Sequence, residues 1–178
     1  MAGAKASIDV EALRAKVRDI PDFPTPGILF RDITPLLSDP AAFRTAVDAM
    51  AAPFHGISTV VAIESRGFIL GAPVAYHLGA GLVPVRKVGR LPAATEREEY
   101  ALEYGSNTVE IHQDAIAPGE RVLVVDDLLA TGGTVRAALN LVERLGAEVA
   151  GISVLAELSF LHGRDQVQGY DLRSLIVY

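Results

Sequence analysis

Hydrophobic residues recur along this chain with two different spacings, which together predict strands alternating with helices. Short apolar runs, typical of strands buried on both faces of a sheet, occupy residues 59–63, 82–85, 121–125, 149–155 and 172–177. Helical spacing is found in residues 9–20, in the segment that begins at Asp39-Pro40, and in residues 68–78 and 135–145. This alternation predicts an α/β protein of one domain, residues 1–178, whose helices cover both faces of a mostly parallel sheet.

One polar segment interrupts this alternation. Residues 86–105 are rich in charged side chains, and residues 108–112 then alternate as an exposed strand does. We expect residues 100–104 to pair with that strand in a hairpin. A long polar insertion within a domain is usually either functional or disordered, so a working hairpin and a solvated one without a role both stay open.

The most informative segment is VLVVDDLLATGGT, from Val122 to Thr134. Its apolar start predicts a buried strand, which leads through two adjacent acids, Asp126 and Asp127, into a turn of small residues and then a helix. The backbone N–H groups of such a turn, its two threonine hydroxyls and the positive end of the helix suit a phosphate group. The two carboxylates suit sugar hydroxyls.

Two common phosphate-binding loops do not match this segment. A Walker loop carries a lysine after its last glycine and the dinucleotide fingerprint has three spaced glycines, whereas this turn has only the pair Gly132-Gly133. A glycine pair alone would favour a plain strand–turn–helix corner. The two acids and two threonines in the same window favour the phosphate site instead.

A second polar cluster, Glu64-Ser65-Arg66-Gly67-Phe68, directly follows the predicted strand 59–63. Because the carboxyl ends of parallel strands share one edge of a sheet, we expect this cluster to lie beside Asp126 and Asp127. Arg66 can make two parallel hydrogen bonds to a phosphate. An arginine in a loop is otherwise most often part of a surface ion pair.

A third segment, FPTPGILFRDI at residues 23–33, is predicted to be a stiff, extended loop because it contains two prolines and a glycine. Its backbone N–H and C=O groups could read the edge of a nitrogen base. A hydrophobic anchor that ties the preceding segment to the core explains the same residues about equally well.

Composition narrows the function further. The chain has 178 residues, half of them hydrophobic, which is enough for a sizeable core. A net charge of −6 disfavours nucleic acid as a partner. The absence of cysteine excludes disulfides and thiolate chemistry and fits a cytoplasmic location, and the four histidines show no metal-ligand spacing. No secretion signal is apparent in residues 1–20, and glycines and prolines interrupt the apolar stretch 67–85, so we expect no membrane association.

Taken together, the three motifs resemble those of the type I phosphoribosyltransferases. Residues 122–134 resemble the family's binding motif for 5-phosphoribosyl 1-pyrophosphate (PRPP), while residues 23–37 and 64–68 are similar to those of the adenine phosphoribosyltransferases within it. The resemblance implies a type I phosphoribosyltransferase fold with a small N-terminal hood, at about residues 21–37, and a mobile lid hairpin, at about residues 86–112.

The resemblance also implies a reaction, in which adenine and PRPP give AMP and pyrophosphate during purine salvage. It implies that Asp126 and Asp127 bind the ribose hydroxyls and, with Arg66, take part in catalysis. The residues implied to bind the phosphate of PRPP or AMP are Ala130, Thr131, Gly132, Gly133 and Thr134, and those implied to bind pyrophosphate are Ser65, Arg66, Arg86 and Lys87.

Further roles follow only from the resemblance. The backbone at Leu29 and Arg31 would read adenine, Glu103 would be the general base and Tyr104 would close the lid. Magnesium is implied as the cofactor, held through substrate oxygens and water with no direct protein ligand. A homodimer is also expected.

Two alternatives stay open. Another purine (hypoxanthine, guanine or xanthine) could be the acceptor, although transferases for those bases tend to have Asp-Thr-Gly and Lys-Gly where this chain has Ala130-Thr131-Gly132 and Arg66-Gly67. A PRPP-sensing regulator without catalysis is the other alternative. Such regulators usually add a DNA-binding domain and a basic surface, which this acidic chain does not suggest.

Overall fold

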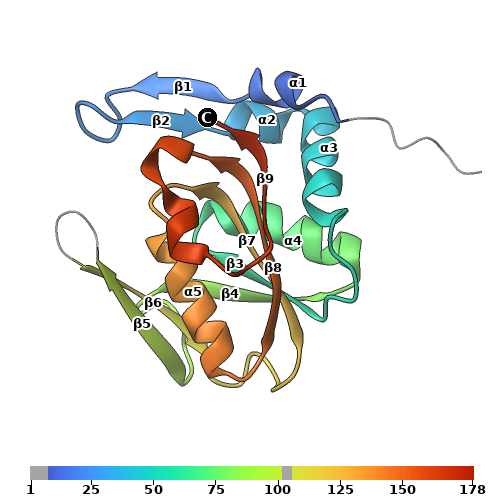
Figure 1. Ribbon diagram of the computed structural model, residues 1–178, viewed down its shortest axis with the longest axis vertical. Coiled ribbons are helices and arrows are strands. Elements are labelled where there is room, and N and C mark those ends of the chain that lie inside the picture. Colours follow the sequence, from blue (N-terminus) through green and yellow to red (C-terminus); the bar gives the residue numbers. More distant parts are fainter. Residues whose placement is uncertain (1–7, 102–105) are drawn as a thin grey trace, which may run out of the picture.

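The computed structural model describes residues 8–101 and 106–178, and its main feature is a seven-stranded sheet of order β5-β6-β4-β3-β7-β8-β9 (Figure 1). The strands of this sheet are β3 (Thr59–Ile63), β4 (Gly81–Lys87), β5 (Thr95–Ala101), β6 (Ser106–His112), β7 (Arg121–Leu129), β8 (Glu148–Glu157) and β9 (Leu172–Val177). A separate two-stranded sheet contains β1 (Arg18–Pro21) and β2 (Leu29–Asp32). The helices are α1 (Val10–Arg14), α2 (Thr34–Ser38), α3 (Pro40–Ala51), α4 (Arg66–Leu78) and α5 (Gly133–Arg144), with 3-10 turns η1 (Ser159–Leu161) and η2 (Gly163–Val167).

The large sheet is mostly parallel, as the βαβ alternation predicted. Strands β4, β3, β7, β8 and β9 pair in parallel, whereas β6 and β5 join the β4 edge in antiparallel fashion. Every residue of β3 is buried. Burial on both faces is what the unbroken apolar runs of the central strands indicated, because crossover helices cover both sides of a parallel sheet.

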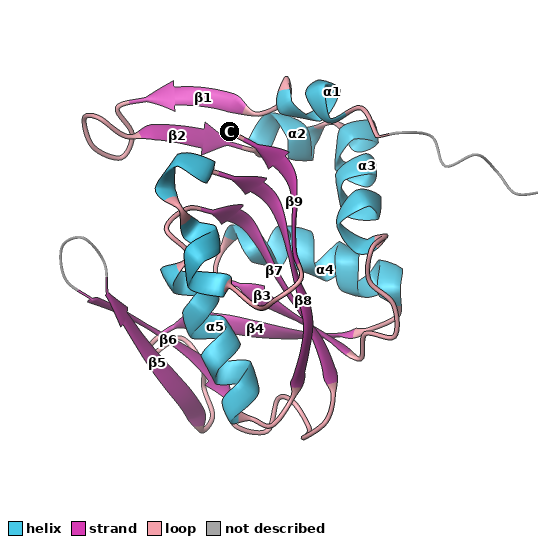
Figure 2. Ribbon diagram, viewed as in Figure 1, coloured by secondary structure: helices cyan, strands magenta, loops and turns pink. Residues whose placement is uncertain are grey.

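Successive residues of the central strands contribute to two different cores. Val61 of β3 and its partner Val124 of β7 belong to the cluster under α5, while Val60 and its partner Leu123 belong to the cluster under α3 and α4. Figure 2 shows α5 on one face of the sheet and α4 on the other. The period-two alternation of side chains along a strand produces this division.

Local signals fix several helix starts. The Asp39 side chain accepts hydrogen bonds from the backbone N–H groups of Ala41 and Ala42, so it caps α3 as the sequence predicted. Asp9 caps α1 in the same way, by accepting a hydrogen bond from the backbone N–H of Ala12. The apolar stretch 67–85 divides between α4 and β4. Within the two described ranges, no helix combines the length and apolar character that a membrane crossing requires.

The predicted helix 9–20 is wrong in its second half. α1 ends at Arg14, and Arg18–Pro21 instead forms β1, which pairs antiparallel with β2. A proline disfavours the helical conformation of the residue before it, so Ile20 is extended ahead of Pro21. The Arg18 guanidinium also bonds the Asp32 carboxylate across the hairpin, at 2.6 Å.

The segment 23–33 is a loop only in its first part. Its last residues form β2, whose Phe30 lies opposite Ile20 of β1. The two prolines lie in the loop part, as predicted. The strand was not predicted, because its partner β1 lies in the segment assigned to a helix.

The polar hairpin also differs from the prediction. β6 pairs with residues 95–101 of β5, so the predicted pairing is present at residues 100 and 101 and extends back to residue 95, while residues 102–105 lie outside the described ranges. β6 is not an exposed strand, because Val109, Glu110 and Ile111 are all buried. The reason is that β6 also pairs with β4, which brings its centre into the core.

Candidate active site

The two acids of the candidate site lie inside a strand rather than in the loop after it. β7 continues to Leu129, beyond the predicted end at Val125, and Asp126 pairs with Val154 of β8. Asp126 and Asp127 are 9% and 6% exposed. Two adjacent buried carboxylates at the carboxyl end of a central strand are costly unless partners satisfy them, which makes this edge the first candidate for a ligand site.

The predicted phosphate loop is present at residues 130–134. It turns at Gly132, whose φ of +86° lies in the left-handed region that favours glycine, and α5 begins at the next residue. A small cavity of about 70 Å³ lies against the loop and is bordered by residues 128–135 and Asp126. The N–H groups at the start of α5 are the donors that an anion would use.

The second cluster meets the first at this edge. α4 begins at Arg66, directly beyond β3, and Gly67 packs so tightly against β7 that an added Cβ would lie 2.8 Å from Oδ1 of Asp126. A side chain at residue 67 would therefore push the two segments apart. The expectation that both clusters share one sheet edge is confirmed.

Arg66 joins all three predicted motifs. Its Nε atom lies 2.9 Å from Oδ2 of Asp127, and its Nη1 donates to the backbone carbonyl of Arg31 at 3.1 Å. The guanidinium also lies over the ring of Phe30, 4.8 Å from the centroid. The Oδ2 atom of Asp127 is buried and makes no hydrogen bond of good geometry within the described residues, so it could accept one from a ligand hydroxyl.

A cavity of about 330 Å³ lies between these groups. Its walls are formed by Ile63, Glu64, Ser65, Arg66, Lys87, Tyr100, Val109, Asp126, Asp127, Leu128 and Thr134. The cavity is therefore lined by side chains of both signs, with the acids on β7 facing the basic groups of β4 and α4. A substrate that combines hydroxyl and phosphate groups matches such a lining.

Burial shifts the acid–base behaviour of the acids. The pKa of Asp126 is raised well above its usual value of 3.8, first by burial and then by the neighbouring negative charge of Asp127. Burial also raises the pKa of Asp127, although the Arg66 guanidinium acts in the opposite direction. The site therefore resists carrying two full negative charges in the absence of further cationic or hydrogen-bonding partners.

The predicted pyrophosphate residues are only partly brought to the cavity. Ser65, Arg66 and Lys87 line it, but Arg86 is not among the described residues that do. The Arg86 guanidinium instead lies 3.2 Å from the Glu64 carboxylate and donates to the Arg90 carbonyl at 3.1 Å.

Glu64 also accepts the backbone N–H of Lys87, at 3.0 Å, and thereby holds β4 against the loop after β3. Burial alone would raise the pKa of Glu64, but the hydrogen bonds from Lys87 and Arg86 outweigh it and lower that pKa. Sequence reasoning gave Glu64 no role. Its place directly after a buried strand was the available signal.

The predicted adenine-reading residues lie in β2, at the border of the site. Leu29 is 46% exposed, and neither Leu29 nor Arg31 is among the described residues that line the cavity. The Arg31 carbonyl already accepts a hydrogen bond from Arg66. The hood therefore meets the site through the contact between the Arg31 carbonyl and Arg66.

Glu103 and Tyr104, the predicted general base and lid residue, lie outside the described residues. The neighbouring Tyr100 lines the cavity, and its hydroxyl accepts a hydrogen bond from the Thr134 hydroxyl at 3.0 Å. The hairpin and the phosphate loop are thus in direct contact. No local pattern in the sequence indicated this pair.

Gly163, to which the sequence assigned no role, packs against the backbone of the phosphate loop. A Cβ added at Gly163 would lie 2.2 Å from the carbonyl oxygen of Ala130, and one added at Gly132 would lie 2.5 Å from the carbonyl oxygen of Gly163. The two backbones are therefore in contact without intervening side chains. The segment after residue 160 forms this support.

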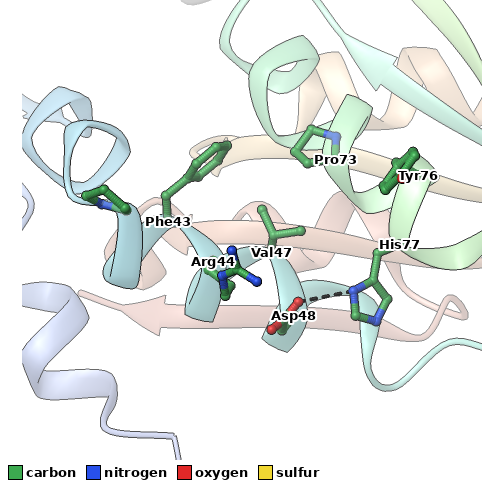
Figure 3. A pocket seen from close by; sticks show the side chains of 8 residues that line it. Phe43, Arg44, Val47, Asp48, Pro73, Tyr76 and His77 are labelled. Carbon is green, nitrogen blue, oxygen red and sulfur yellow. Dashed lines mark ion pairs between the residues drawn. The ribbon is translucent and has the colours of Figure 1, made fainter.

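Among the described residues, no group of three or more His, Asp or Glu side chains is placed to hold a metal ion. A larger hollow, of about 500 Å³, lies elsewhere, between α3 and α4. Figure 3 shows Phe43, Val47, Pro73 and Tyr76 around it, with an ion pair between Asp48 and His77 at 3.1 Å. The Tyr76 side chain is almost fully exposed.

Paired acids ahead of a glycine-containing anion loop, on a parallel sheet extended by an antiparallel hairpin, define the class of phosphoribosyltransferases. Residues 42–176 match the family model described as the phosphoribosyl transferase domain. The chain is 59% identical over 172 residues to an adenine phosphoribosyltransferase of Thermobifida fusca, covering 95% of this chain and 98% of that protein. The chain belongs to the adenine phosphoribosyltransferase family.

Solved structures agree with this assignment. A crystal structure of an adenine phosphoribosyltransferase from Rhodothermus marinus has a TM-score of 0.92 and 50% identity, covering 95% of this chain and 98% of the other. The Saccharomyces cerevisiae enzyme, complexed with an imino-altritol bisphosphate and adenine, has a TM-score of 0.88 and 40% identity, with 93% and 97% covered. The predicted type I phosphoribosyltransferase fold is confirmed.

Proposed function

We propose that this protein is a magnesium-dependent pentosyltransferase that converts adenine and PRPP to AMP and pyrophosphate, a step of purine salvage. The observation that carries this proposal is the cavity in which Asp126 and Asp127 face Ser65, Arg66 and Lys87, beside the anion loop. That cavity presents acceptors for sugar hydroxyls between two sets of anion donors. Membership in the adenine phosphoribosyltransferase family supports adenine as the acceptor.

In the proposed complex the acids bind the sugar and the loop binds its 5′-phosphate. Asp127 would accept a hydrogen bond from a ribose hydroxyl at its unsatisfied Oδ2 atom, and Asp126 would accept another. Residues 130–134 would donate backbone N–H and threonine hydroxyl groups to the phosphate. Each charge-assisted hydrogen bond contributes about 1.5–3 kcal/mol, so several would be needed to hold so anionic a substrate.

The reaction breaks the bond between C1′ and the pyrophosphate oxygen, which leaves with the electron pair, and forms a bond between C1′ and N9 of adenine. Arg66, Ser65 and Lys87 would stabilise the negative charge of the leaving group, with Arg86 oriented through Glu64. Magnesium, when bound through pyrophosphate oxygens, supplies further neutralisation of that charge. The hard carboxylate oxygens on β7 suit such a hydrated ion as outer partners.

The base would enter between the hood, about residues 21–37, and the lid, about residues 86–112, within one domain of residues 1–178. The backbone of Leu29 and Arg31 would contact adenine, and Glu103 would remove the N9 proton while Tyr104 covers the site. Closure would exclude water, which could otherwise attack C1′.

Two alternatives are not favoured. Neither alternative, a transferase for another purine or a non-catalytic PRPP sensor, accounts for the similarity of the chain, over nearly its full length, to adenine phosphoribosyltransferases. Initial rates with adenine, hypoxanthine, guanine and orotate, each with PRPP and Mg²⁺, separate these possibilities. Strong preference for adenine is expected, preference for hypoxanthine would contradict the substrate, and no transfer to any base would favour the sensor.

We further propose that the protein works as a cytoplasmic homodimer and that the hollow between α3 and α4 contacts a second copy. The side chains of Arg44 and Asp48 lie one turn apart on α3, so two-fold symmetry can bring each opposite the other in the partner. Tyr76→Glu should therefore shift the mass measured by light scattering from dimer to monomer, whereas Tyr76→Phe should not. A monomeric wild-type protein would contradict this proposal.

A further inference from the structure

We infer that the Tyr178 side chain is a positioning residue for the nucleobase: through Arg31 it holds the hood strand β2 against Arg66. This inference rests on the proposed function, because it assigns adenine affinity to a residue that touches neither substrate nor cavity. It concerns a part of the chain that the sequence motifs left without a role.

Tyr178 is the residue on which the Arg31 side chain packs. The Arg31 guanidinium carbon lies 3.8 Å from the centroid of the Tyr178 ring, and that of Arg14 lies 5.1 Å from the same ring. The Arg31 side chain is only 13% exposed. Its Nη1 pairs with Asp19, and its buried Nε has no hydrogen-bond partner among the residues that the structure describes. The aromatic face is therefore a principal contact of this guanidinium.

The backbone of Tyr178 is itself anchored at the end of the large sheet. The backbone N–H of Tyr178 donates to the Glu157 carbonyl at the end of β8, at 2.9 Å. Its carbonyl oxygen accepts from the backbone N–H of Ser159 at 3.0 Å and from the Ser159 hydroxyl at 2.5 Å. Three hydrogen bonds thus fix the Tyr178 backbone, one to β8 of the large sheet and two to Ser159 in η1, directly after that strand.

The hood depends on such contacts because its two strands form a sheet of their own. Among the described strands, neither β1 nor β2 pairs with the seven-stranded sheet. Figure 1 shows the end of β9 beside β2. Side-chain contacts must therefore set the position of β2, and Arg31 makes two of them: its side chain packs on Tyr178, and its carbonyl binds Arg66.

Arg66 carries this position into the site. The same guanidinium that binds the Arg31 carbonyl lies 2.9 Å from Asp127 and over the Phe30 ring. A hood displaced by loss of the Tyr178 ring would move the base-binding wall relative to the sugar-binding acids. The anion loop at residues 130–134 connects β7 to α5, away from the hood, so it would keep its position.

The test compares Tyr178→Leu with Tyr178→Phe, which keeps the ring and loses only the hydroxyl. Tyr178→Leu should raise KM for adenine about tenfold, while KM for PRPP and kcat change less than about twofold. Tyr178→Phe should behave like the wild type. Tyr170→Leu is the matched control, because it removes a ring that packs on Arg136, at 5.8 Å, away from the hood.

Hydrogen exchange of residues 18–32 in the free protein gives a second readout that does not need activity. Faster exchange there in Tyr178→Leu, but not in Tyr178→Phe or Tyr170→Leu, supports the inference. Unchanged adenine KM with unchanged exchange overturns it, as does an equal rise in both KM values, which would indicate general destabilisation. A wild type without adenine transfer would overturn the proposed function instead, and the exchange comparison would then decide the positioning role alone.

Discussion

The Arg66 guanidinium and the Asp127 carboxylate lie 2.9 Å apart at the wall of the cavity and join a residue expected to bind pyrophosphate to one expected to bind ribose. In the free protein the two groups therefore form an ion pair. A substrate that carries both a hydroxyl and a pyrophosphate can satisfy them separately. The pair thus partly offsets the negative charge of a buried carboxylate in the free protein.

Arg66→Lys is expected to lower kcat/KM for PRPP by about 10- to 100-fold. Lysine keeps the positive charge but loses the planar fork that reaches Asp127, the Arg31 carbonyl and a phosphate together. Steady-state kinetics at fixed adenine measures the effect. Arg173→Lys is the control, because Arg173 forms an exposed pair with Asp171, and its activity should stay at the wild-type level. Equal activity of both variants would contradict the role of Arg66.

Asp126→Asn is expected to stabilise the free protein while lowering kcat/KM about 10- to 100-fold through loss of a charged acceptor. Because the pKa of Asp126 is raised in the folded state, the folded protein binds more protons than the unfolded chain above pH 3.8. The contribution of this group to stability is therefore present at low pH and is lost as the pH rises through the folded-state pKa.

Urea unfolding of Asp126→Asn and the wild type at a series of pH values above 3.8 measures the difference. The stability of the variant relative to the wild type should increase as the pH rises. Asparagine can keep the contact of Oδ1 with the Asp127 N–H, at 2.9 Å, so local geometry is retained. A constant stability difference across the range would show that Asp126 does not titrate as described.

Gly163→Ala is expected to raise KM for PRPP at least about tenfold and to lower stability by about 1–3 kcal/mol. The new methyl group would lie 2.2 Å from the Ala130 carbonyl, and since that atom belongs to the backbone, the anion loop has to move. Gly81→Ala is the control, because its methyl group would lie 3.7 Å from its nearest neighbours. Steady-state kinetics and thermal unfolding measure the two effects. The same KM for PRPP and the same stability in both variants would contradict the prediction.

The sequence predicted the parts of the site that depend on local patterns. Apolar runs located β3 and the start of β7, and the rule that parallel strands end at one edge brought Arg66 together with Asp127. Periodicity ended β7 too early, because acids normally mark a strand's end whereas here Asp126 continues the pairing with β8.

Residues that act through distant partners could not be predicted in this way. Gly163 and Tyr178 matter because of which backbone or side chain approaches them from far along the chain, and no spacing rule encodes that. The strand β1 was assigned to a helix for the same reason. Its apolar positions fit helical spacing, and only pairing with β2 selects the extended form.

Glu103→Gln tests the one catalytic role that lies outside the described residues. If Glu103 takes the proton of adenine, the amide cannot do so, and kcat should fall about 100-fold or more while the affinity for PRPP stays constant. Single-turnover rates and PRPP titration by calorimetry measure the two quantities separately. Glu99→Gln is the matched control on the same hairpin, because Glu99 is exposed and accepts a hydrogen bond from Ser106. Equal kcat values for the two variants would show that Glu103 is not the general base, and water would then be the first alternative acceptor of the proton. The proposed sugar and phosphate sites would be unaffected.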